Sequence, residues 1–334
     1  MDLDTSYLGL NLANPLVASP GPITRTVAGI KRLAEAGVGA VVLPSLFEEQ
    51  IRLDAERDAR LAGAGSESFG EAVSYIPDPG IDTEPRQYLS LIERAREAVR
   101  IPVIASLNGT TPGGWTGYAA AMQRAGASAI ELNVYYLHGH LMVSGAQADE
   151  RYVEVLRTVR AAVTIPIAVK LAPYFSSLGE IAGRLREAGA DGLVLFNRFM
   201  QTDIDPDALT VSAGLPLSQP AEATLPRSWI ARLRGRVPVS LAATTGVETY
   251  ADVAAYLLAG ADVVMTTSAL LRHGAEHAAT LLDGLRAWME RKGFTGLDQV
   301  RGRLSAAAGA DPTVYGRANY LSTIEEAIRT YAPG

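Results

Sequence analysis

The sequence predicts an α/β protein of the (β/α)8 TIM-barrel class, because two kinds of strand signal alternate strictly along the chain. Four apolar strands follow directly after a proline: Pro15, Pro102, Pro166 and Pro238. Four others follow an Ala-Gly pair: Gly37, Gly126, Gly189 and Gly260. Each strand is continuously apolar, which fits burial on both faces of a parallel sheet. Eight such strands with helices between them close into a barrel, whose active site lies at the C-terminal ends of the strands.

Both signals have a physical basis. Proline is tolerated at the first residue of a strand, and glycine just past a helix adopts the left-handed conformation that turns the chain. The expected strands are residues 15–19, 40–43, 102–106, 129–133, 166–170, 192–196, 238–242 and 262–266. The expected helices are residues 26–36, 84–99, 115–125, 149–163, 178–188, 227–234, 249–258 and 275–291. Most of these helices repeat apolar residues at three and four spacing, as Ile181, Leu185 and Ala188 do.

Two long insertions interrupt this pattern on the C-terminal face. The first, at about residues 46–82, begins with a helical pattern and becomes rich in Gly and Ser near residues 63–70. The second, at about residues 200–225, is polar and contains three prolines. A C-terminal helical tail follows from residue 293. Long loops on this face usually act as lids or binding elements. We therefore expect residues 1–334 to form a single barrel domain.

Composition excludes several classes of protein. The 334 residues suit one barrel of about 250 residues with insertions. The net charge of −6 and the lack of a basic run argue against a nucleic-acid partner. No apolar run reaches the roughly 18 residues of a membrane helix, and the N-terminus lacks signal-peptide features, so we expect a cytoplasmic protein. The absence of cysteine excludes disulfides, thiolate iron–sulfur clusters and a cysteine nucleophile.

The last two strands end in a cluster typical of phosphate binding. Thr244, Thr245 and Gly246 follow the seventh strand, and Thr267 and Ser268 follow the eighth. Barrels frequently bind phosphate at these two loops through backbone N–H groups. The alternative is that small hydroxyl residues merely end strands and cap helices.

Lys170 ends the fifth strand, which is otherwise strongly apolar. A lysine that points into the mouth of the barrel needs an anionic partner, such as a phosphate, a carboxylate or a reduced flavin ring. Asn133 and Asn197 end the fourth and sixth strands, where they could bind a planar heterocycle or satisfy loop backbone. His138 and His140 could contribute to a metal site, but we favour a solvent-facing or lid role and predict no metal.

At this point the chain resembles the dihydroorotate dehydrogenase family of FMN-dependent barrels, in its soluble branch. The resemblance runs from Leu8 to about Leu304 and rests on several motifs in the family's order. These are Leu8-Gly-Leu, Asn14-Pro, Ala18-Ser, Glu131-Leu-Asn, Val169-Lys-Leu-Ala-Pro-Tyr-Phe, Ala188-Gly-Ala-Asp-Gly, Gly246-Val and Thr267-Ser-Ala.

The resemblance implies an FMN cofactor and assigns residues to it. The phosphate would lie on Thr245, Gly246, Thr267 and Ser268. The ring would meet Ala18, Ser19, Asn108, Asn133 and Lys170, with Lys170 near the ring oxygen that becomes negative on reduction. Asn133 and Asn197 match positions where the family holds its substrate. We also assign Ser45, at the end of the second strand, to substrate binding.

The departures from the family pattern concern the substrate and the base. After Glu-Leu-Asn the family carries a serine, then a catalytic Cys or Ser, then Pro-Asn. Here these places hold Tyr135, Tyr136, Leu137 and His138. The family's lysine at the end of the second strand is Pro44, and the first glycine of its phosphate turn is Thr245. Tyr136 is the positional substitute for the base, and a tyrosine near pH 7 works better as an acid. His138 is the alternative donor or base.

We therefore predict an FMN-dependent oxidoreductase that transfers hydride between flavin and a C–C or C=C bond of a small, planar, pyrimidine-like substrate. The substrate need not be dihydroorotate. One alternative is a non-catalytic FMN electron-transfer or sensor protein. Another is a flavin-free phosphate-binding lyase or isomerase that uses Lys170, and a third is dihydrouridine synthesis on RNA. The resemblance also implies a homodimer. Without cysteine, electron transfer to NAD requires a redox partner protein.

Overall fold

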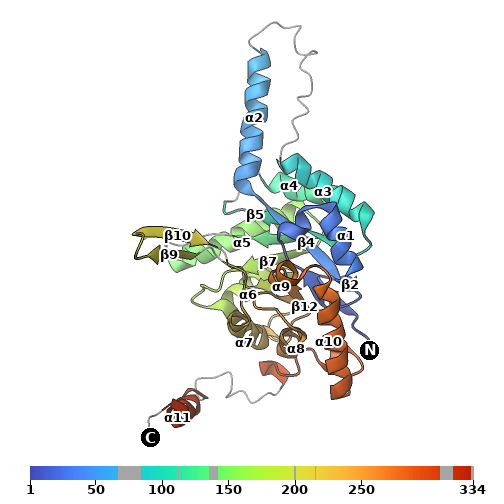
Figure 1. The fold of residues 1–334 in the computed structure, drawn as a ribbon. Helices are drawn as coiled ribbons and strands as arrows, with labels where there is room; N and C mark the ends of the chain where they lie inside the picture. The colour runs from blue at the N-terminus through green and yellow to red at the C-terminus, as the bar shows by residue number, and fades with distance from the viewer. Residues whose placement is uncertain are drawn as a thin grey trace.

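The chain forms the predicted closed barrel of eight parallel strands, seen in a computed structural model (Figure 1). The structure describes residues 1–66, 84–111, 113, 115–134, 142–198, 201–214, 216–308 and 319–331. In barrel order the strands are β3 (Leu16–Ala18), β4 (Ala40–Phe47), β5 (Val103–Asn108), β6 (Ala129–Asn133), β7 (Ile167–Leu171), β8 (Gly192–Leu195), β11 (Ser240–Ala243) and β12 (Val263–Thr266). Every predicted strand is present, and the fold-class prediction is confirmed.

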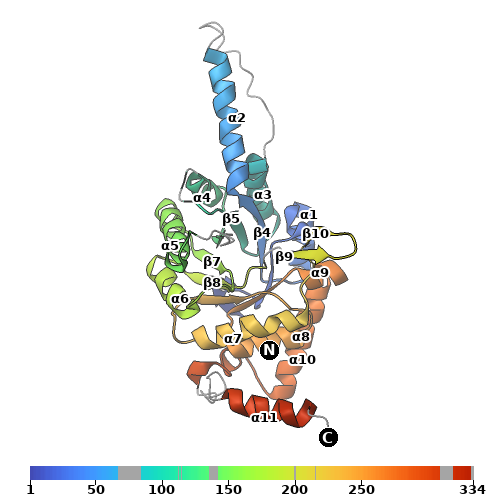
Figure 2. The ribbon, with the colours of Figure 1, turned by 90° about the vertical axis from the view of Figure 1, so that its left-hand side faces the viewer.

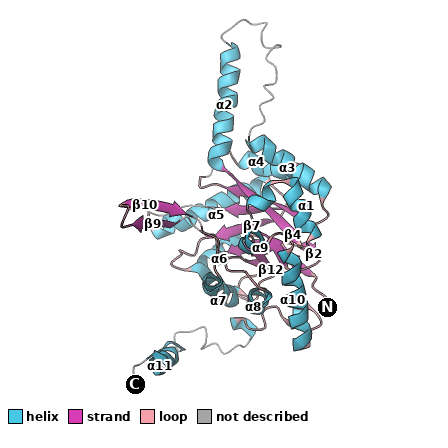
Figure 3. Ribbon diagram, in the orientation of Figure 1, coloured by secondary structure: helices cyan, strands magenta, loops and turns pink. Residues whose placement is uncertain are grey.

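Helices surround the strands in Figure 3. The helices between strands are α1 (Val27–Glu35), α3 (Glu84–Ala98), α4 (Thr116–Arg124), α5 (Gly145–Ala162), α6 (Leu178–Glu187), α7 (Thr224–Leu233) and α8 (Tyr250–Ala259). After β12 come α9 (Ser268–His273), which we did not predict, and α10 (His277–Lys292). The four predicted turn glycines all have positive φ, at 93°, 97°, 104° and 123° for Gly37, Gly126, Gly189 and Gly260.

Two predicted helices start earlier than expected. The structure begins α5 at Gly145, because Ser144 forms a capping box with Gln147. Helix α7 begins at Thr224 and directly continues a 3-10 turn, η3 (Pro220–Ala223). In both cases the start lies before the apolar periodicity that we used to place it.

The apolar core has two layers. One lies inside the barrel and includes Val42, Ile104, Val194 and Met265. The other lies between the strands and the helices, and it includes Leu185. Strands that contribute to both layers are buried on both faces, which explains their continuous apolar sequence.

A hairpin that the sequence did not reveal closes the N-terminal end of the barrel. Strands β1 (Thr5–Tyr7) and β2 (Leu10–Leu12) pair antiparallel around Leu8 and Gly9, whose φ angles are +55° and +75°. Two central residues with positive φ are the mark of a type I′ turn. Tyr7, Leu8 and Leu12 pack against the residues inside the barrel. The backbone N–H of Leu8 donates to the Ser240 hydroxyl (3.0 Å) at the start of β11.

The two insertions project from the barrel (Figures 1 and 2). The first contains the predicted helix, α2 (Glu48–Ser66), and its remainder, residues 67–83, lies outside the described residues. The second contains a hairpin of β9 (Gln201–Asp205) and β10 (Thr210–Gly214), where we predicted only a polar loop. The Asp205 carboxylate accepts from the N–H groups of Asp207 and Ala208, which fixes the hairpin turn.

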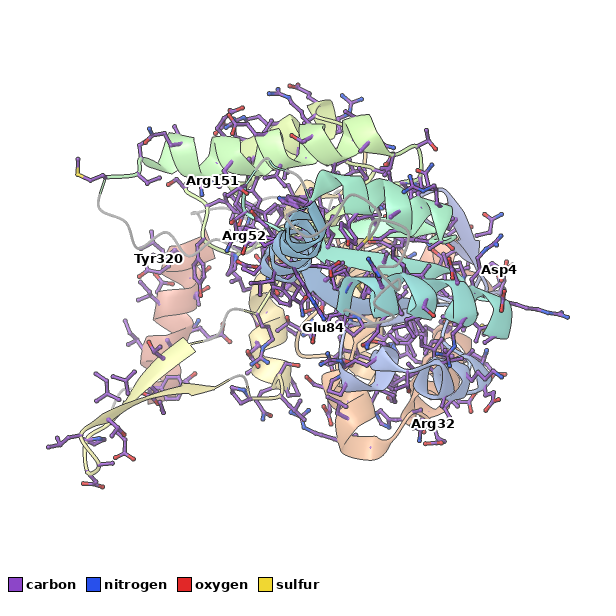
Figure 4. The ribbon with its side chains drawn as sticks, turned by 90° about the horizontal axis from the view of Figure 1, so that it is seen from above. Asp4, Arg32, Arg52, Glu84, Arg151 and Tyr320 are labelled. Carbon is purple, nitrogen blue, oxygen red and sulfur yellow. The ribbon has the colours of Figure 1, made fainter. Side chains whose placement is uncertain are left out.

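The C-terminal tail has the predicted helical character. It contains two 3-10 turns, η4 (Leu297–Gln299) and η5 (Ala306–Ala308), and one helix, α11 (Asn319–Tyr331). Helix α11 and its residue Tyr320 lie apart from the barrel in the view from above (Figure 4). Among the described residues, no helix combines the length and apolar character needed to cross a membrane.

Candidate active site

The C-terminal ends of the strands surround a cavity of about 420 Å³. Residues predicted for the site line it from seven strands or the loops after them: Ser19, Ser45, Asn133, Lys170, Asn197, Thr245, Thr267 and Ser268. Residues from β3 and β12 therefore meet residues from β6, β7 and β8 around one space, as expected for a barrel mouth.

Lys170 is held by a buried carboxylate. Its side chain is 11% exposed, and its ammonium donates to Glu131 Oε1 at 3.2 Å. Glu131 lies on the neighbouring strand β6 and is 1% exposed. The carboxylate was one of the anionic partners that we considered for Lys170, but we had not identified Glu131. Its position on the strand next to β7 was the signal that could have found it.

The β3 and β12 side of the cavity is closely packed. Thr267 donates its hydroxyl to the Ser19 carbonyl (3.2 Å), and a Cβ added to Gly21 would lie 2.5 Å from Thr267 Oγ1. Ser19 Oγ is buried and has no hydrogen-bond partner among the described residues. Backbone and hydroxyl groups therefore line this side of the cavity, and Ser19 Oγ is free to bind a ligand.

The loop after β11 has a constrained backbone. Thr245 and Gly246 have φ angles of +83° and +70°, and a Cβ on Gly246 would lie 2.8 Å from the Ala223 nitrogen. The Tyr256 hydroxyl donates to the carbonyls of Thr244 (3.1 Å) and Thr245 (2.7 Å). Burial raises the pKa of Tyr256, so its hydroxyl keeps its proton. These contacts hold the loop against the cavity.

Ser218, from the second insertion, covers this loop. Its hydroxyl accepts from the Gly246 N–H (3.2 Å) and lies 3.1 Å from the Ser268 hydroxyl. Arg272 donates to the Ser218 carbonyl at 2.7 Å. Arg272 also forms an ion pair with Glu248, so the guanidinium behind the predicted phosphate loops already has a counter-charge. Sequence reasoning missed Ser218, because its place depends on the path of a long loop.

The part of the cavity formed by β4 to β8 carries paired polar side chains. Asn197 Nδ2 donates to Asn133 Oδ1 at 3.0 Å, so the two predicted asparagines are in direct contact. The hydroxyls of Ser45 and Ser106 lie 2.7 Å apart. Tyr88 accepts from the Ser106 N–H (2.8 Å), and burial raises its pKa well above the ordinary value. This wall offers amide and hydroxyl groups to a ligand.

Other predicted site residues lie elsewhere. The Ala18 side chain packs in the layer between strands and helices, and Asn108, although buried at the end of β5, does not line the cavity. Gly246 contributes only backbone behind Thr245. Tyr136 and His138 lie outside the described residues. Their roles stay predictions.

A second cavity of about 570 Å³ adjoins the first. The two share five lining residues, Phe196, Asn197, Arg198, Pro216 and Thr245. Arg198 pairs with Glu222 at 3.1 Å. The wall of the second cavity is otherwise largely apolar and includes Tyr174 and Leu225, both well exposed.

A parallel barrel with hydroxyl-rich loops after its last two strands and a lysine from its fifth is typical of TIM-barrel enzymes that bind phosphate groups at this face. The model of one family, described as dihydroorotate dehydrogenase, matches residues 2–289. The chain belongs to the dihydroorotate dehydrogenase family, whose members are FMN-dependent oxidoreductases that act on CH–CH donors. The resemblance inferred from the sequence motifs is confirmed.

Several archaeal proteins named dihydroorotate dehydrogenase B (NAD(+)), catalytic subunit, are similar to this chain. The protein of Methanothermobacter thermautotrophicus is 28% identical over 307 residues, which cover 90% of this chain and 97% of the relative. The protein of Methanocella arvoryzae is 30% identical over 313 residues, with 88% and 95% covered. The protein of Pyrococcus furiosus is 24% identical over 313 residues, with 90% and 98% covered.

Proposed function

We propose that this chain is a single-domain FMN oxidoreductase that transfers hydride between the flavin and a C–C or C=C bond of a small, planar, pyrimidine-like substrate. The observation that carries the proposal is the mouth cavity, where a buried lysine faces hydroxyl-rich loops after β11 and β12. Family membership supports the flavin chemistry. The residues after β6 differ from the family's catalytic motif, so the identity of the substrate is not fixed by family membership.

The residues of the mouth fit an FMN. Gly246 leaves no room for a side chain, and Thr245, Thr267 and Ser268 supply hydroxyl groups for the phosphate. Ser19 Oγ is a buried polar atom without a hydrogen bond in the described residues, and it faces the same cavity as Lys170. We assign Ala18 and Asn108 to the ring through their neighbouring backbone and strand ends. The bound FMN would supply the hydride acceptor and donor.

Asn133, Asn197 and Ser45 are our substrate-binding residues. The contact between the two asparagines orients their amides toward one side of the cavity, where they can hydrogen-bond a planar heterocycle. The adjoining 570 Å³ cavity leaves room for a substrate larger than a bare pyrimidine ring.

We assign proton transfer at the substrate to Tyr136, with His138 as the alternative. A positioned acid or base typically contributes about 10²–10⁴-fold to rate. Tyr136→Phe should therefore lower turnover by at least tenfold while leaving the bound flavin in place. Full activity of that variant on the true substrate would contradict the assignment.

We further propose that the chain works as a homodimer with a redox partner protein. The relatives named for NAD(+) are catalytic subunits, and this chain has no cysteine with which to hold an iron–sulfur relay. Electrons bound for NAD would then pass through a second polypeptide.

The deciding experiment has two steps. Cofactor released from purified protein is identified by its mass, and FMN is expected at about one per chain. Dihydroorotate and other dihydro-heterocycles are then screened anaerobically for bleaching of the flavin absorbance. Protein without flavin bands would end the FMN proposal. A flavin that no substrate reduces or reoxidises would favour the non-catalytic electron-transfer alternative.

A further inference from the structure

Glu131 is a buried charge that the proposed chemistry does not yet use. It lies on β6 and is 1% exposed, with Oε1 3.2 Å from the Lys170 ammonium. Its second oxygen, Oε2, is buried and has no hydrogen-bond partner among the described residues. Burial of a carboxylate is costly, and apolar replacements of buried ion pairs are often neutral or stabilising. Stability alone is therefore a weak reason for a glutamate at this position.

Among the described residues, the one ion pair of Glu131 is with Lys170. Tyr7 approaches from the β1–β2 hairpin and Tyr88 from α3. Burial raises the pKa of both tyrosines, and the negative charge of Glu131 raises both further. Both phenols are therefore neutral at physiological pH. Ser106, the residue of β5 paired with Glu131, is uncharged.

The mouth cavity as a whole is electrically balanced. Its described lining has two cationic side chains, Lys170 and Arg198. Lys170 pairs with Glu131 from inside the barrel, and Arg198 pairs with Glu222 at the rim. The formal charge of these four groups sums to zero. A ligand in the cavity therefore faces the Lys170 ammonium, whose positive charge is largely offset by the Glu131 carboxylate on its other side.

We propose that Glu131 is a positioning residue that fixes the Lys170 ammonium and offsets its charge, and so lowers the reduction potential of the bound flavin. The proposal rests on FMN occupying the mouth. Reduction adds negative charge to a flavin, and a net positive site would favour it. With Glu131 present the site is neutral, so the flavin releases its electrons more readily to an acceptor.

The test measures the midpoint potential of the FMN-loaded protein by spectroelectrochemical titration. Glu131→Gln keeps the size and an oxygen that can accept from Lys170, but it removes the negative charge. We expect its potential to rise by about 30 mV, equivalent to a tenfold change for a two-electron couple. Lys170→Gln removes the positive charge and should lower the potential. The double variant should lie between the two single variants.

Asp262→Asn is the matched control. Asp262 is a nearly buried carboxylate paired with Arg234 at 2.9 Å, but it lies at the N-terminal end of the barrel. Its loss should reduce stability and leave the flavin potential unchanged. An equal rise in Asp262→Asn and Glu131→Gln would mean a general effect of loosened structure, and it would overturn the proposal.

Two further outcomes separate the inference from the proposed function. A potential that is unchanged or lowered in flavin-loaded Glu131→Gln overturns the role of Glu131 and leaves the FMN proposal intact. Wild-type protein without FMN overturns the proposed function itself. If Glu131→Gln alone does not fold, the double variant carries no unpaired charge. Its potential is then compared with that of Lys170→Gln, and it must be the higher of the two.

Discussion

The two ends of the barrel are built from the same strands but differ in how their polar groups are satisfied. At the N-terminal end, Asp262 accepts from the Leu241 N–H (2.8 Å) and pairs with Arg234 and Arg301. At the C-terminal end, Ser19 Oγ and Glu131 Oε2 are buried without hydrogen-bond partners in the described part of the chain. Buried polar atoms are usually paired, and exceptions need an explanation. Tyr7 at the closed end also has a buried hydroxyl without a described partner, but of these residues only Ser19 lines the mouth cavity, where its hydroxyl is left for a ligand.

Each end of the barrel also contains a non-glycine residue with a strained backbone, but different contacts hold the two residues in place. Leu8 and Thr245 are non-glycine residues with φ angles of +55° and +83°. Leu8 lies in the turn of the β1–β2 hairpin and is 4% exposed, so apolar packing holds it in place. Thr245 lines the mouth cavity and is held by hydrogen bonds to its loop. Strain at a ligand-facing residue is typical of functional sites.

Among the variants that test the difference between the two ends, Asp262→Ala should have the largest effect on the free energy of unfolding. The substitution leaves Arg234 and Arg301 without their shared carboxylate and removes the acceptor of the Leu241 N–H. Removal of one partner of a buried ion pair costs about 3 kcal/mol or more. Urea unfolding followed by circular dichroism should show this loss. Refolded protein should bind FMN with unchanged affinity, and weaker binding would contradict the separation of the two ends.

Gly246→Ala tests the opposite end. The added Cβ would lie 2.8 Å from the Ala223 nitrogen and the Gln219 oxygen, at a φ of +70° that alanine disfavours. We expect FMN affinity to fall about tenfold or more, measured by fluorescence titration of the apoprotein. Gly293→Ala is the control, since Gly293 has φ +73° but no atoms within 4 Å of an added Cβ. It should retain FMN, and equal loss in both variants would refute a specific cradle.

A smaller effect concerns pH at the foot of α2. Burial raises the pKa of Glu48, but hydrogen bonds from the Thr111 hydroxyl and the N–H groups of Thr110 and Thr111 lower it, as does the charge of Arg52. The net pKa lies below the ordinary value, so the carboxylate stabilises the fold at neutral pH. This stabilisation is lost as the pH falls below about 4.3.

Comparison of wild type with Glu48→Gln measures this contribution. The urea midpoint of the wild type should fall more between pH 7 and pH 3 than that of the variant. Glu49→Gln, at an exposed neighbour, provides the control and should follow the wild type. An equal fall of the urea midpoint with pH in wild type and Glu48→Gln would refute the contribution of this carboxylate to stability.

Tyr7→Phe should have the smallest effect. The hydroxyl of Tyr7 is buried inside the barrel and has no hydrogen-bond partner among the described residues. Removal of an unpaired buried polar group is nearly neutral or stabilising. The free energy of unfolding should therefore stay within about 1 kcal/mol of wild type. A larger loss would show that the hydroxyl has a partner, such as a buried water.

Local chemistry explains why the barrel was predictable. Proline before a strand and glycine after a helix act within a few residues, so their signals survive in the bare sequence. The β1–β2 hairpin was missed because its turn places Leu8 at positive φ, where turn sequences usually carry Asn, Asp or Gly. The β9–β10 hairpin did leave a signal, an alternation through Ile204 and Val211 around an Asp-Pro-Asp turn, which we read as a polar loop.

The residues that line the mouth cavity were predictable only in part, because only those that end strands are marked by local sequence. Residues that end strands, such as Ser19, Asn133 and Lys170, reach the cavity because the barrel brings strand ends together. The side-chain partners depend on neighbours across strands and on the paths of long loops. Glu131 could be inferred from strand order, whereas Ser218 required the structure.

The closure of the N-terminal end has a consequence for synthesis. Thr5 donates to the Asp262 carbonyl and the Asp2 N–H donates to the Thr295 carbonyl, so each residue is translated roughly 260–290 residues before its partner. At about 5–20 residues per second, the ribosome needs roughly 15–60 s to deliver those partners. Until Ala242, Val263 and Met265 are made, the barrel interior against which Tyr7 and Leu12 pack is incomplete. Nascent chains halted before residue 240 should therefore bind chaperones through this segment.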